Sequence, residues 1–195
     1  MGKKKYLEYI SKLFEKSAVV DFTSINRIAS HGKQVKHYAK QIVNRLIKQG
    51  KIYKIGKGLY SSISESSLAV FGFTPAYLGL QDALSFHNLW EQETNPVIIT
   101  TNNIRQGVRK VFGNNILLRR ITPKYFFGME YVKEGELYIP VSDIEKTFID
   151  MVYFRKKIDK EMLKSFKEKI DAKKLKDYLK KYPVRISNRV LSKIK

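Results

Sequence analysis

The most regular segment of the sequence is residues 33–49, KQVKHYAKQIVNRLIKQ, whose apolar residues recur at helical spacing. They fall at positions i, i+3, i+4 and i+7 and so form one stripe of an α-helix. The next residue, Gly50, stands where a left-handed residue commonly ends a helix. A helix with a single apolar stripe must pack against other elements, so this segment predicts a small core built around a long helix. The stripe comprises Val35, Tyr38, Ala39, Ile42, Val43, Leu46 and Ile47.

Two short alternating runs, KIYKI and LYSS, follow this helix and are separated by Gly-Lys-Gly. Ile52 and Ile55 can face a core, while the lysines of the runs take the other positions. Gly56 and Gly58 supply the backbone conformations that a tight turn requires. The pattern therefore predicts a β-hairpin directly after the long helix.

Two shorter patterns precede the long helix and complete the order of elements. Residues 3–16 are amphipathic and predict a first helix, and Asp21 or Thr23 is expected to cap a short second helix. The expected order is helix, short helix, turn, long helix and hairpin. This order predicts that residues 1–66 form a winged helix-turn-helix domain, in which the third helix enters the major groove of DNA.

Residues 67–195 are expected to form a second domain of mixed α+β type. A helix is expected over residues 74–90, with Thr74 as its N-cap and Pro75 at its first position. Short apolar runs predict strands at residues 96–101, 115–122 and 136–141.

The last third of the chain is expected to be helical. Residues 142–154 predict a helix in which Ser142 and Glu145 form a capping box. Residues 155–195 are rich in lysine, and Asp159 is expected to cap a helix within them. The apolar stripes of this basic helical tail are narrow, so we expect the tail to pack on the mixed domain.

Charge is distributed unevenly along the chain, which has a formal net charge of +20. Residues 1–66 carry 14 Lys and Arg against 4 Asp and Glu, and residues 155–195 carry 16 against 5. Residues 67–154 are nearly neutral, with 8 against 9. A general abundance of lysine is the simpler reading, but it would not leave a neutral middle. The pattern favours a polyanionic partner, and double-stranded DNA is the expected one.

Composition also limits the chemistry and the compartment. The sequence contains no cysteine, which excludes disulfides, a thiolate nucleophile and zinc sites of the Cys type. No apolar run approaches the roughly 18 residues of a membrane-spanning helix. The first residues, MGKKKYLEYI, lack the apolar segment of a signal peptide. We expect a cytoplasmic protein without a membrane partner.

The polar face of the long helix carries the residue types that read DNA. Gln41 and Asn44 can form paired hydrogen bonds with adenine in the major groove, and lysines can reach phosphates or guanine. Lysines on the hairpin can contact the neighbouring backbone or minor groove, which explains why a wing would be basic. A solvated helix face is the alternative interpretation. The DNA-binding residues predicted from this pattern are Lys33, His37, Lys40, Gln41, Asn44, Lys48, Lys54 and Lys57.

Enzymatic chemistry finds little support in the sequence. The histidines His31, His37 and His87 are scattered and make no metal-binding pair at i, i+4. Asp143 and Glu145 suit the positive start of a helix. The sequence has no nucleophile elbow and no phosphate-binding P-loop. We therefore expect no catalytic residue, no metal and no cofactor.

A second basic segment lies in the middle of the chain. Arg105, Arg109 and Lys110 are close together in NNIRQGVRKVFG, and Arg119 and Arg120 follow. They are candidates for a basic ridge that binds an acidic partner or extends a DNA contact. A plain solvated surface is an equally good interpretation.

Five short blocks of the sequence occur in an order that resembles one protein family. They are RLIKQGKIYKIGKGLY, LSFHNLW, PVIITT, ILLRRIT and YIPVSDIEKTFIDMVYF. In this order they resemble the wing and the C-terminal domain of AbiE-type (AbiEi-like) antitoxins, the abortive-infection regulators of type IV toxin–antitoxin systems. The last block contains Glu145, Lys146 and Thr147, which resemble the family's strand-then-helix motif. The resemblance covers most of residues 15–155.

The resemblance implies a DNA-binding antitoxin that binds inverted repeats in its own promoter. It would repress an operon shared with a nucleotidyltransferase-like toxin, which a type IV antitoxin need not bind directly. The helix start GKQVKHYAKQ departs from the Ser-, Thr- and Arg-rich starts of many relatives, so their operator does not carry over. The family's DNA contacts map to Lys33, Lys36, Lys40, Asn44, Arg45, Lys54 and Lys57.

Three functional hypotheses follow from the sequence. The first is a transcriptional repressor and antitoxin, which binds one promoter tightly. The second is a nucleic-acid-binding protein without sequence preference, such as a chromatin or RNA factor. The third is an enzyme acting on nucleic acid, which would lose activity without losing affinity when Asp143 or Asp150 is changed.

Overall fold

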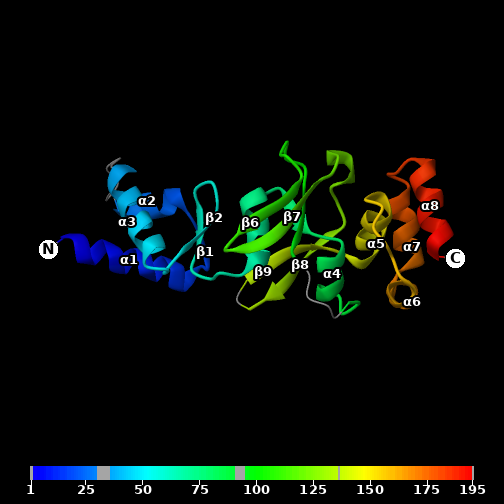
Figure 1. Ribbon diagram of the computed structural model, residues 1–195, viewed down its shortest axis with the longest axis horizontal. Coiled ribbons are helices and arrows are strands. Elements are labelled where there is room, and N and C mark those ends of the chain that lie inside the picture. Colours follow the sequence, from blue (N-terminus) through cyan, green and yellow to red (C-terminus); the bar gives the residue numbers. More distant parts are fainter. Residues whose placement is uncertain (1, 30–35, 91–94, 136, 195) are drawn as a thin grey trace. The chain divides into compact units, whose positions relative to one another are not determined.

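The computed structural model describes residues 2–29, 36–90, 95–135 and 137–194. The chain divides into two compact units, Met1–Gly72 with Lys110–Asn114, and Phe73–Arg109 with Asn115–Lys195. Below they are called the N-terminal unit and the C-terminal unit. The fold is of mixed α+β type, as the sequence predicts (Figure 1).

The N-terminal unit packs helices on a small antiparallel sheet. The sheet has the order β1-β3-β2, and its register pairs Val20 with Tyr60 and Lys54 with Tyr60. Strand β1 is only three residues long and is not predicted by the sequence pattern. The elements are α1 (Gly2–Lys16), β1 (Val19–Asp21), α2 (Phe22–Ala29), α3 (Lys36–Lys48), β2 (Tyr53–Gly56), β3 (Leu59–Ser61) and the 3-10 helix η1 (Ser66–Phe73).

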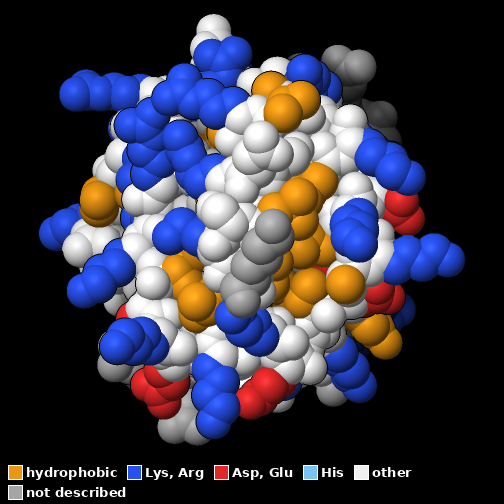
Figure 2. All heavy atoms as spheres, turned by 90° about the vertical axis from the view of Figure 1, so that its right-hand side faces the viewer, with side chains coloured by type: hydrophobic (Ala, Val, Ile, Leu, Met, Phe, Trp, Pro, Cys, Tyr) orange, Lys and Arg blue, Asp and Glu red, His pale blue; other side chains and the backbone are white. Residues whose placement is uncertain are grey.

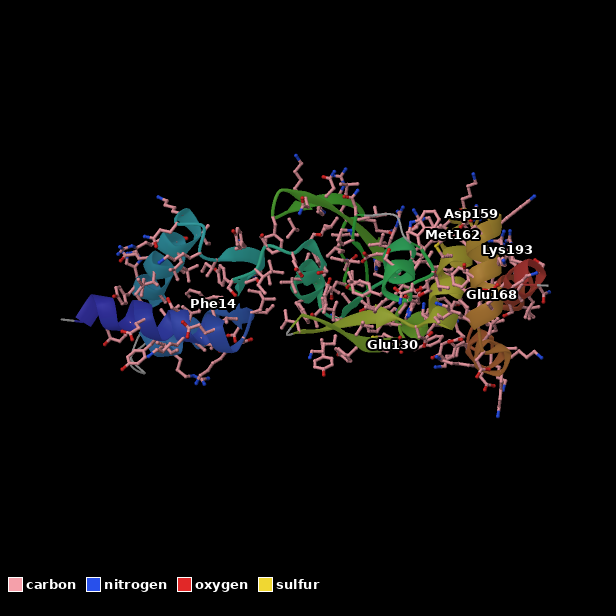
Figure 3. The ribbon with its side chains drawn as sticks, turned by 90° about the horizontal axis from the view of Figure 1, so that it is seen from below. Phe14, Glu130, Asp159, Met162, Glu168 and Lys193 are labelled. Atoms are coloured by element: carbon pink, nitrogen blue, oxygen red, sulfur yellow. The ribbon has the colours of Figure 1, made fainter. Side chains whose placement is uncertain are left out.

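Local signals in the sequence account for the ends of these helices. Oδ1 of Asp21 accepts a hydrogen bond of 2.9 Å from the backbone N–H of Ser24, which caps α2 as predicted. Gly50 ends α3 with φ of 66°. The predicted stripe of α3 faces the core, where Ala39 and Leu46 are buried beside Phe14 of α1, which is labelled in Figure 3.

The C-terminal unit is built on a six-stranded mixed sheet with the order β6-β7-β5-β4-β9-β8. β5 is parallel to β7 and antiparallel to β4, while β9 is parallel to β4 and antiparallel to β8. The strands are β4 (Ala76–Leu78), β5 (Val97–Thr100), β6 (Gly107–Val111), β7 (Asn114–Arg120), β8 (Met129–Glu134) and β9 (Leu137–Ser142). The end of β6 and the first residue of β7 fall within Lys110–Asn114, which is grouped with the N-terminal unit.

The helices of this unit gather beside the sheet (Figure 1). They share one apolar core with it, in which Phe148 and Phe166 pack at 4.9 Å between ring centroids and Tyr125 stacks on Tyr182 at 4.3 Å. Asp159 caps α6 through Met162, as predicted. The helices are α4 (Gln81–Phe86), the 3-10 helix η2 (Pro123–Tyr125), α5 (Ile144–Tyr153), α6 (Lys160–Lys169), α7 (Ala172–Leu179) and α8 (Val184–Ile194).

Two predictions for this unit are wrong. The helix expected over residues 74–90 is only the six-residue α4, because Ala76–Leu78 form a buried strand between β5 and β9. The capping box of α5 is also different, because the N-cap is Asp143, whose Oδ1 accepts from the N–H of Lys146 at 2.8 Å. Ser142 belongs to β9 instead.

Candidate nucleic-acid interface

Helix α3 presents a continuous polar face to solvent. Burial of Ala39, Ile42, Val43 and Leu46 turns the opposite side of the helix outward. Nε2 of Gln41 lies 3.3 Å from Nε2 of His37, within hydrogen-bond distance. The exposed residues of this face are His37, Lys40, Gln41, Asn44, Arg45, Lys48 and Gln49.

A hollow of about 450 Å³ lies on this face of α3. Gln41, Asn44, Arg45 and Lys48 line it, mostly through the carbon atoms of their side chains. Together with Gln49 they line the whole hollow. Amide, guanidinium and ammonium groups side by side are the chemistry that hydrogen-bonds base edges and phosphates.

The positive charge of this region is not neutralised locally. Residues 36–62, from the start of α3 through the hairpin, contain no Asp or Glu. Arg45 and Lys48 lie in the last turn of α3, where the negative end of the helix dipole also favours cations. The region is therefore a continuous electropositive segment. The helix dipole favours only Arg45 and Lys48, and it does not explain the other cations.

The hairpin that follows α3 exposes two further lysines. Lys54 in β2 and Lys57 in the turn are both exposed, while Ile55 between them is buried. Gly58 has φ of 70°, and its carbonyl accepts a 2.7 Å hydrogen bond from the N–H of Phe22. This bond fastens the tip of the hairpin to the start of α2, so the lysines project from an anchored loop.

The structure says less about the other residues that the sequence predicts to bind DNA or an acidic partner. Lys33 lies outside the described residues, and Lys36 is the first residue of α3. Arg109 and Lys110 are exposed neighbours in strand β6, so they point to opposite faces of the strand. Nη2 of Arg109 donates to the carbonyl of Arg105 at 3.2 Å. A basic ridge formed by Arg105, Arg109 and Lys110 stays a prediction.

Sequence reasoning missed a buried polar cluster in the C-terminal unit. Lys146 and Asp150, one turn apart in α5, form an ion pair with both side chains 0 % exposed. The hydroxyl of Tyr77 donates to Oδ2 of Asp150 at 2.7 Å. Burial lowers the pKa of Lys146 and raises that of Asp150, and each group counteracts the other's shift.

The start of α5 is tied to α7 by a second set of polar contacts. Nζ of Lys174 lies 2.8 Å from Glu145 and 3.3 Å from Asp143. Tyr178 donates to Oδ2 of Asp143 at 2.7 Å, and the N–H of Asp171 donates to Glu145 at 2.8 Å. The carboxylates of Asp143 and Glu145 therefore hold the start of α5 against α7.

A catalytic role for this cluster has no geometric support. Lys146 and Asp150 have no exposed surface that a substrate could touch. Within the described part of the chain, no three His, Asp or Glu side chains come together in a way that could hold a metal ion. His87 is also packed, with Nε2 2.7 Å from the carbonyl of Ser142 and Nδ1 3.7 Å from Glu130.

Comparison with known proteins supports the fold only. No family model matches the sequence, and no curated protein matches it significantly. Among solved structures, the chain is similar to the RV2827C protein from Mycobacterium tuberculosis, with a TM-score of 0.66 and 10% sequence identity. The match covers 97% of this chain and 76% of that one. The two proteins thus share an architecture.

In the ranges that the structure describes, no helix has both the length and the apolar character needed to cross a bilayer.

Proposed function

We propose that the protein is a DNA-binding transcriptional repressor whose N-terminal unit is a winged helix-turn-helix. The order α1–β1–α2–α3–β2–β3, with a sheet in the order β1-β3-β2, supports this assignment. The observation that carries the proposal is the exposed, acid-free polar face of α3 next to a lysine-bearing hairpin.

In this proposal the side chains of the N-terminal unit divide into two roles. Gln41 and Asn44 read base edges, because their amides can pair with adenine. Lys40, Arg45 and Lys48 contact phosphates from the same helix. The hairpin is the wing, and its lysines contact the backbone beside the groove. No cofactor, metal or catalytic step is assigned to the chain.

We further propose that the repressor is the antitoxin of a type IV toxin–antitoxin operon and acts in the cytoplasm on inverted repeats in its own promoter. The support is the ordered resemblance to AbiE-type antitoxins. Its blocks supply the hairpin, β5, β7 and the β9–α5 junction, which are central elements of the two units. In this proposal the C-terminal unit provides the antitoxin function, and the toxin is a nucleotidyltransferase-like protein.

Fluorescence anisotropy tests the repressor proposal. The protein is titrated against its own upstream DNA and against scrambled DNA of equal length, at two salt concentrations. A preference on the order of a thousandfold for the upstream sequence is expected. Equal and steeply salt-dependent binding to both would replace the proposal with a nucleic-acid-binding protein that lacks sequence preference.

Co-expression tests the antitoxin proposal separately. A nucleotidyltransferase-like reading frame next to the gene is expected, and its expression should arrest growth unless this protein is present. A variant with weakened promoter recognition, Asn44→Ala with Arg45→Gln, should still relieve toxicity, because the proposal places that function in the C-terminal unit. Unrelieved growth arrest with wild-type protein would contradict the antitoxin role.

A further inference from the structure

A hollow in the C-terminal unit is lined almost entirely by cations. It measures about 480 Å³ and lies between the end of α5 and helix α8. Val152 is its one apolar lining residue. The others are Arg155, Lys156, Arg185, Arg189 and Lys193.

The fold brings these charges together from two elements. Arg185, Arg189 and Lys193 recur every four residues along α8, which places them on one side of the helix. Figure 3 labels Lys193 on this helix. The other two cations follow the end of α5, where Arg155 adopts φ of 54° and the N–H of Lys156 bonds the carbonyl of Met151 at 2.8 Å. This tight turn holds both side chains at the mouth of the hollow.

Among the residues that the structure describes, the charges of the hollow have no counter-ions. Among the described residues, none of the five cations forms an ion pair, and no acidic side chain lines the hollow. Asp143 and Glu145 at the other end of α5 are already paired with Lys174. Figure 2, which looks onto the end of this unit, shows Lys and Arg side chains gathered on one part of the surface, away from Asp and Glu.

The pKa of Lys156, which lines the hollow, is lowered first by burial and then by the nearby charge of Arg119. Like charges held together reduce stability, and an anion in the hollow would relieve that cost.

We propose that this basic hollow binds the phosphodiester backbone of nucleic acid, independently of base sequence. Three of its five cations are arginines, whose planar forks bind phosphate oxygens in pairs. The cations of α8 repeat about every 6 Å along the helix axis, which suits successive phosphates of one strand. The hollow offers no aromatic ring on which a base could stack, so it reads the backbone.

The structure favours nucleic acid over an anionic membrane. An amphipathic helix that binds a membrane inserts an apolar face beside its cations. In α8 that face is occupied, because Val190 is fully buried and Ile186, Leu191 and Ile194 pack against the core of the unit. The assignment goes beyond the proposed repressor function, because it gives the C-terminal unit its own contact with nucleic acid and does not depend on operator recognition by α3.

The test uses the full chain and a matched control. The hollow variant is Arg185→Gln/Arg189→Gln/Lys193→Gln. The control, Lys160→Gln/Lys164→Gln/Lys173→Gln, removes the same charge from exposed positions of α6 and α7 that lie outside the hollow. Anisotropy is measured with scrambled DNA duplex over a range of salt concentrations, so the result does not depend on sequence preference.

The hollow variant should bind the duplex at least about tenfold more weakly, and its slope of log affinity against log salt should fall by roughly 2–3, since each phosphate contact contributes about 0.9. The control should stay within about twofold of wild type. The same loss should appear in an Asn44→Ala/Arg45→Gln/Lys48→Gln background, which separates the hollow from α3. Equal behaviour of the hollow and control variants would overturn the proposal.

Two further measurements remove the remaining ambiguities. Hydrogen exchange of the α8 amides should slow when duplex is added to wild-type protein, a readout that needs no variant to fold. Vesicles of phosphatidylserine and phosphatidylcholine, and inorganic tripolyphosphate, are titrated in parallel. If the hollow variant lost affinity only for vesicles, or only for tripolyphosphate, and kept its affinity for duplex, the nucleic-acid assignment would be wrong.

Discussion

The hydroxyl of Tyr77 in β4 donates a 2.7 Å hydrogen bond to the carboxylate of Asp150 in α5, 73 residues away in the chain. The other oxygen of that carboxylate pairs with Lys146. All three side chains are fully buried. The cluster therefore fixes α5 against the centre of the sheet through groups that have no access to water.

Replacing Lys146 alone should be strongly destabilising. Lys146→Met leaves the buried Asp150 without its cation and should lower the free energy of unfolding by about 3–5 kcal/mol. The triple variant Lys146→Met/Asp150→Leu/Tyr77→Phe removes every polar group of the cluster and should recover most of this loss, because buried ion pairs are often replaceable by apolar packing.

Urea unfolding of the two variants measures these effects, with Lys164→Met at an exposed position of α6 as the control. A triple variant as unstable as the single one would mean that packing around α5, and not the unpaired charge, sets the loss.

The cluster also shows where sequence reasoning stops. In isolation, Glu-Lys-Thr at the start of a helix is typical of an exposed turn, yet Glu145 through Val152 are all buried. The available signal was the surrounding run IEKTFIDMVYF, which is apolar on nearly every side and so indicates an enclosed helix. A lysine and an aspartate four residues apart in such a helix predict a buried pair.

Local patterns predicted some elements well and others poorly for a physical reason. Helix α3 and its polar face follow from a stripe that recurs within the segment itself. The assignment of Ala76–Leu78 failed because its strand conformation is set by β5 and β9, which come later in the chain. Strand β1 has three residues, too few for a period-2 pattern, and it is fixed by pairing with β3.

The basic hollow of the C-terminal unit could not be predicted from local sequence patterns either. The spacing of Arg185, Arg189 and Lys193 was visible, but their meeting with Arg155 and Lys156 depends on the packing of α8 on α5. The lysine-rich composition of residues 155–195 indicated a positive charge there, but it did not indicate which side chains would form a binding site.

Asp82 should make stability depend on pH. Burial raises its pKa to about 7; a hydrogen bond from the backbone of Val97 opposes the shift, and Glu134 adds to it. The unfolded chain loses this proton near pH 4. Between about pH 4 and 7 the folded state thus holds more protons, so the contribution of Asp82 to stability falls as pH rises.

Asp82→Asn should remove this dependence. The variant should match wild type near pH 4 and exceed it by about 2–4 kcal/mol above pH 7, as judged by urea unfolding at a series of pH values. Glu161→Gln, at an exposed first-turn acid of α6, should change stability by less than about 0.5 kcal/mol. A difference between Asp82→Asn and wild type that is constant over pH would contradict the assignment.

Substitutions in the N-terminal unit should separate base contacts from backbone contacts. Asn44→Ala or Gln41→Ala should cost roughly 1–3 kcal/mol in binding the protein's own promoter and little in binding scrambled DNA. Lys54→Ala and Lys57→Ala should weaken binding to both about equally and reduce the salt slope. Anisotropy on the two DNAs measures both effects. If all four variants behaved alike, the groove assignment of α3 would be wrong.

The proposed wing should also depend on two glycines that meet backbone to backbone. A Cβ atom on Gly56 in β2 would lie 2.9 Å from Cα of Gly72, and one on Gly72 would lie 2.8 Å from the carbonyl oxygen of Ile55. Both distances are too short for a real side chain, and the atoms met belong to the backbone, which cannot rotate away. The hairpin therefore rests on the end of η1 only while both positions are glycine.

Gly72→Ala should lower the free energy of unfolding by about 1–3 kcal/mol, in the range of overpacking substitutions. It should also weaken DNA binding, because the hairpin that carries Lys54 and Lys57 has to move. Gly50→Asn is the matched control, since Gly50 has φ of 66° but open space around it, and asparagine tolerates that conformation. Thermal unfolding and promoter binding are measured for both variants, and Gly72→Ala is compared with the control. If Gly72→Ala kept wild-type stability and affinity, close packing of the glycines would not hold the hairpin in place.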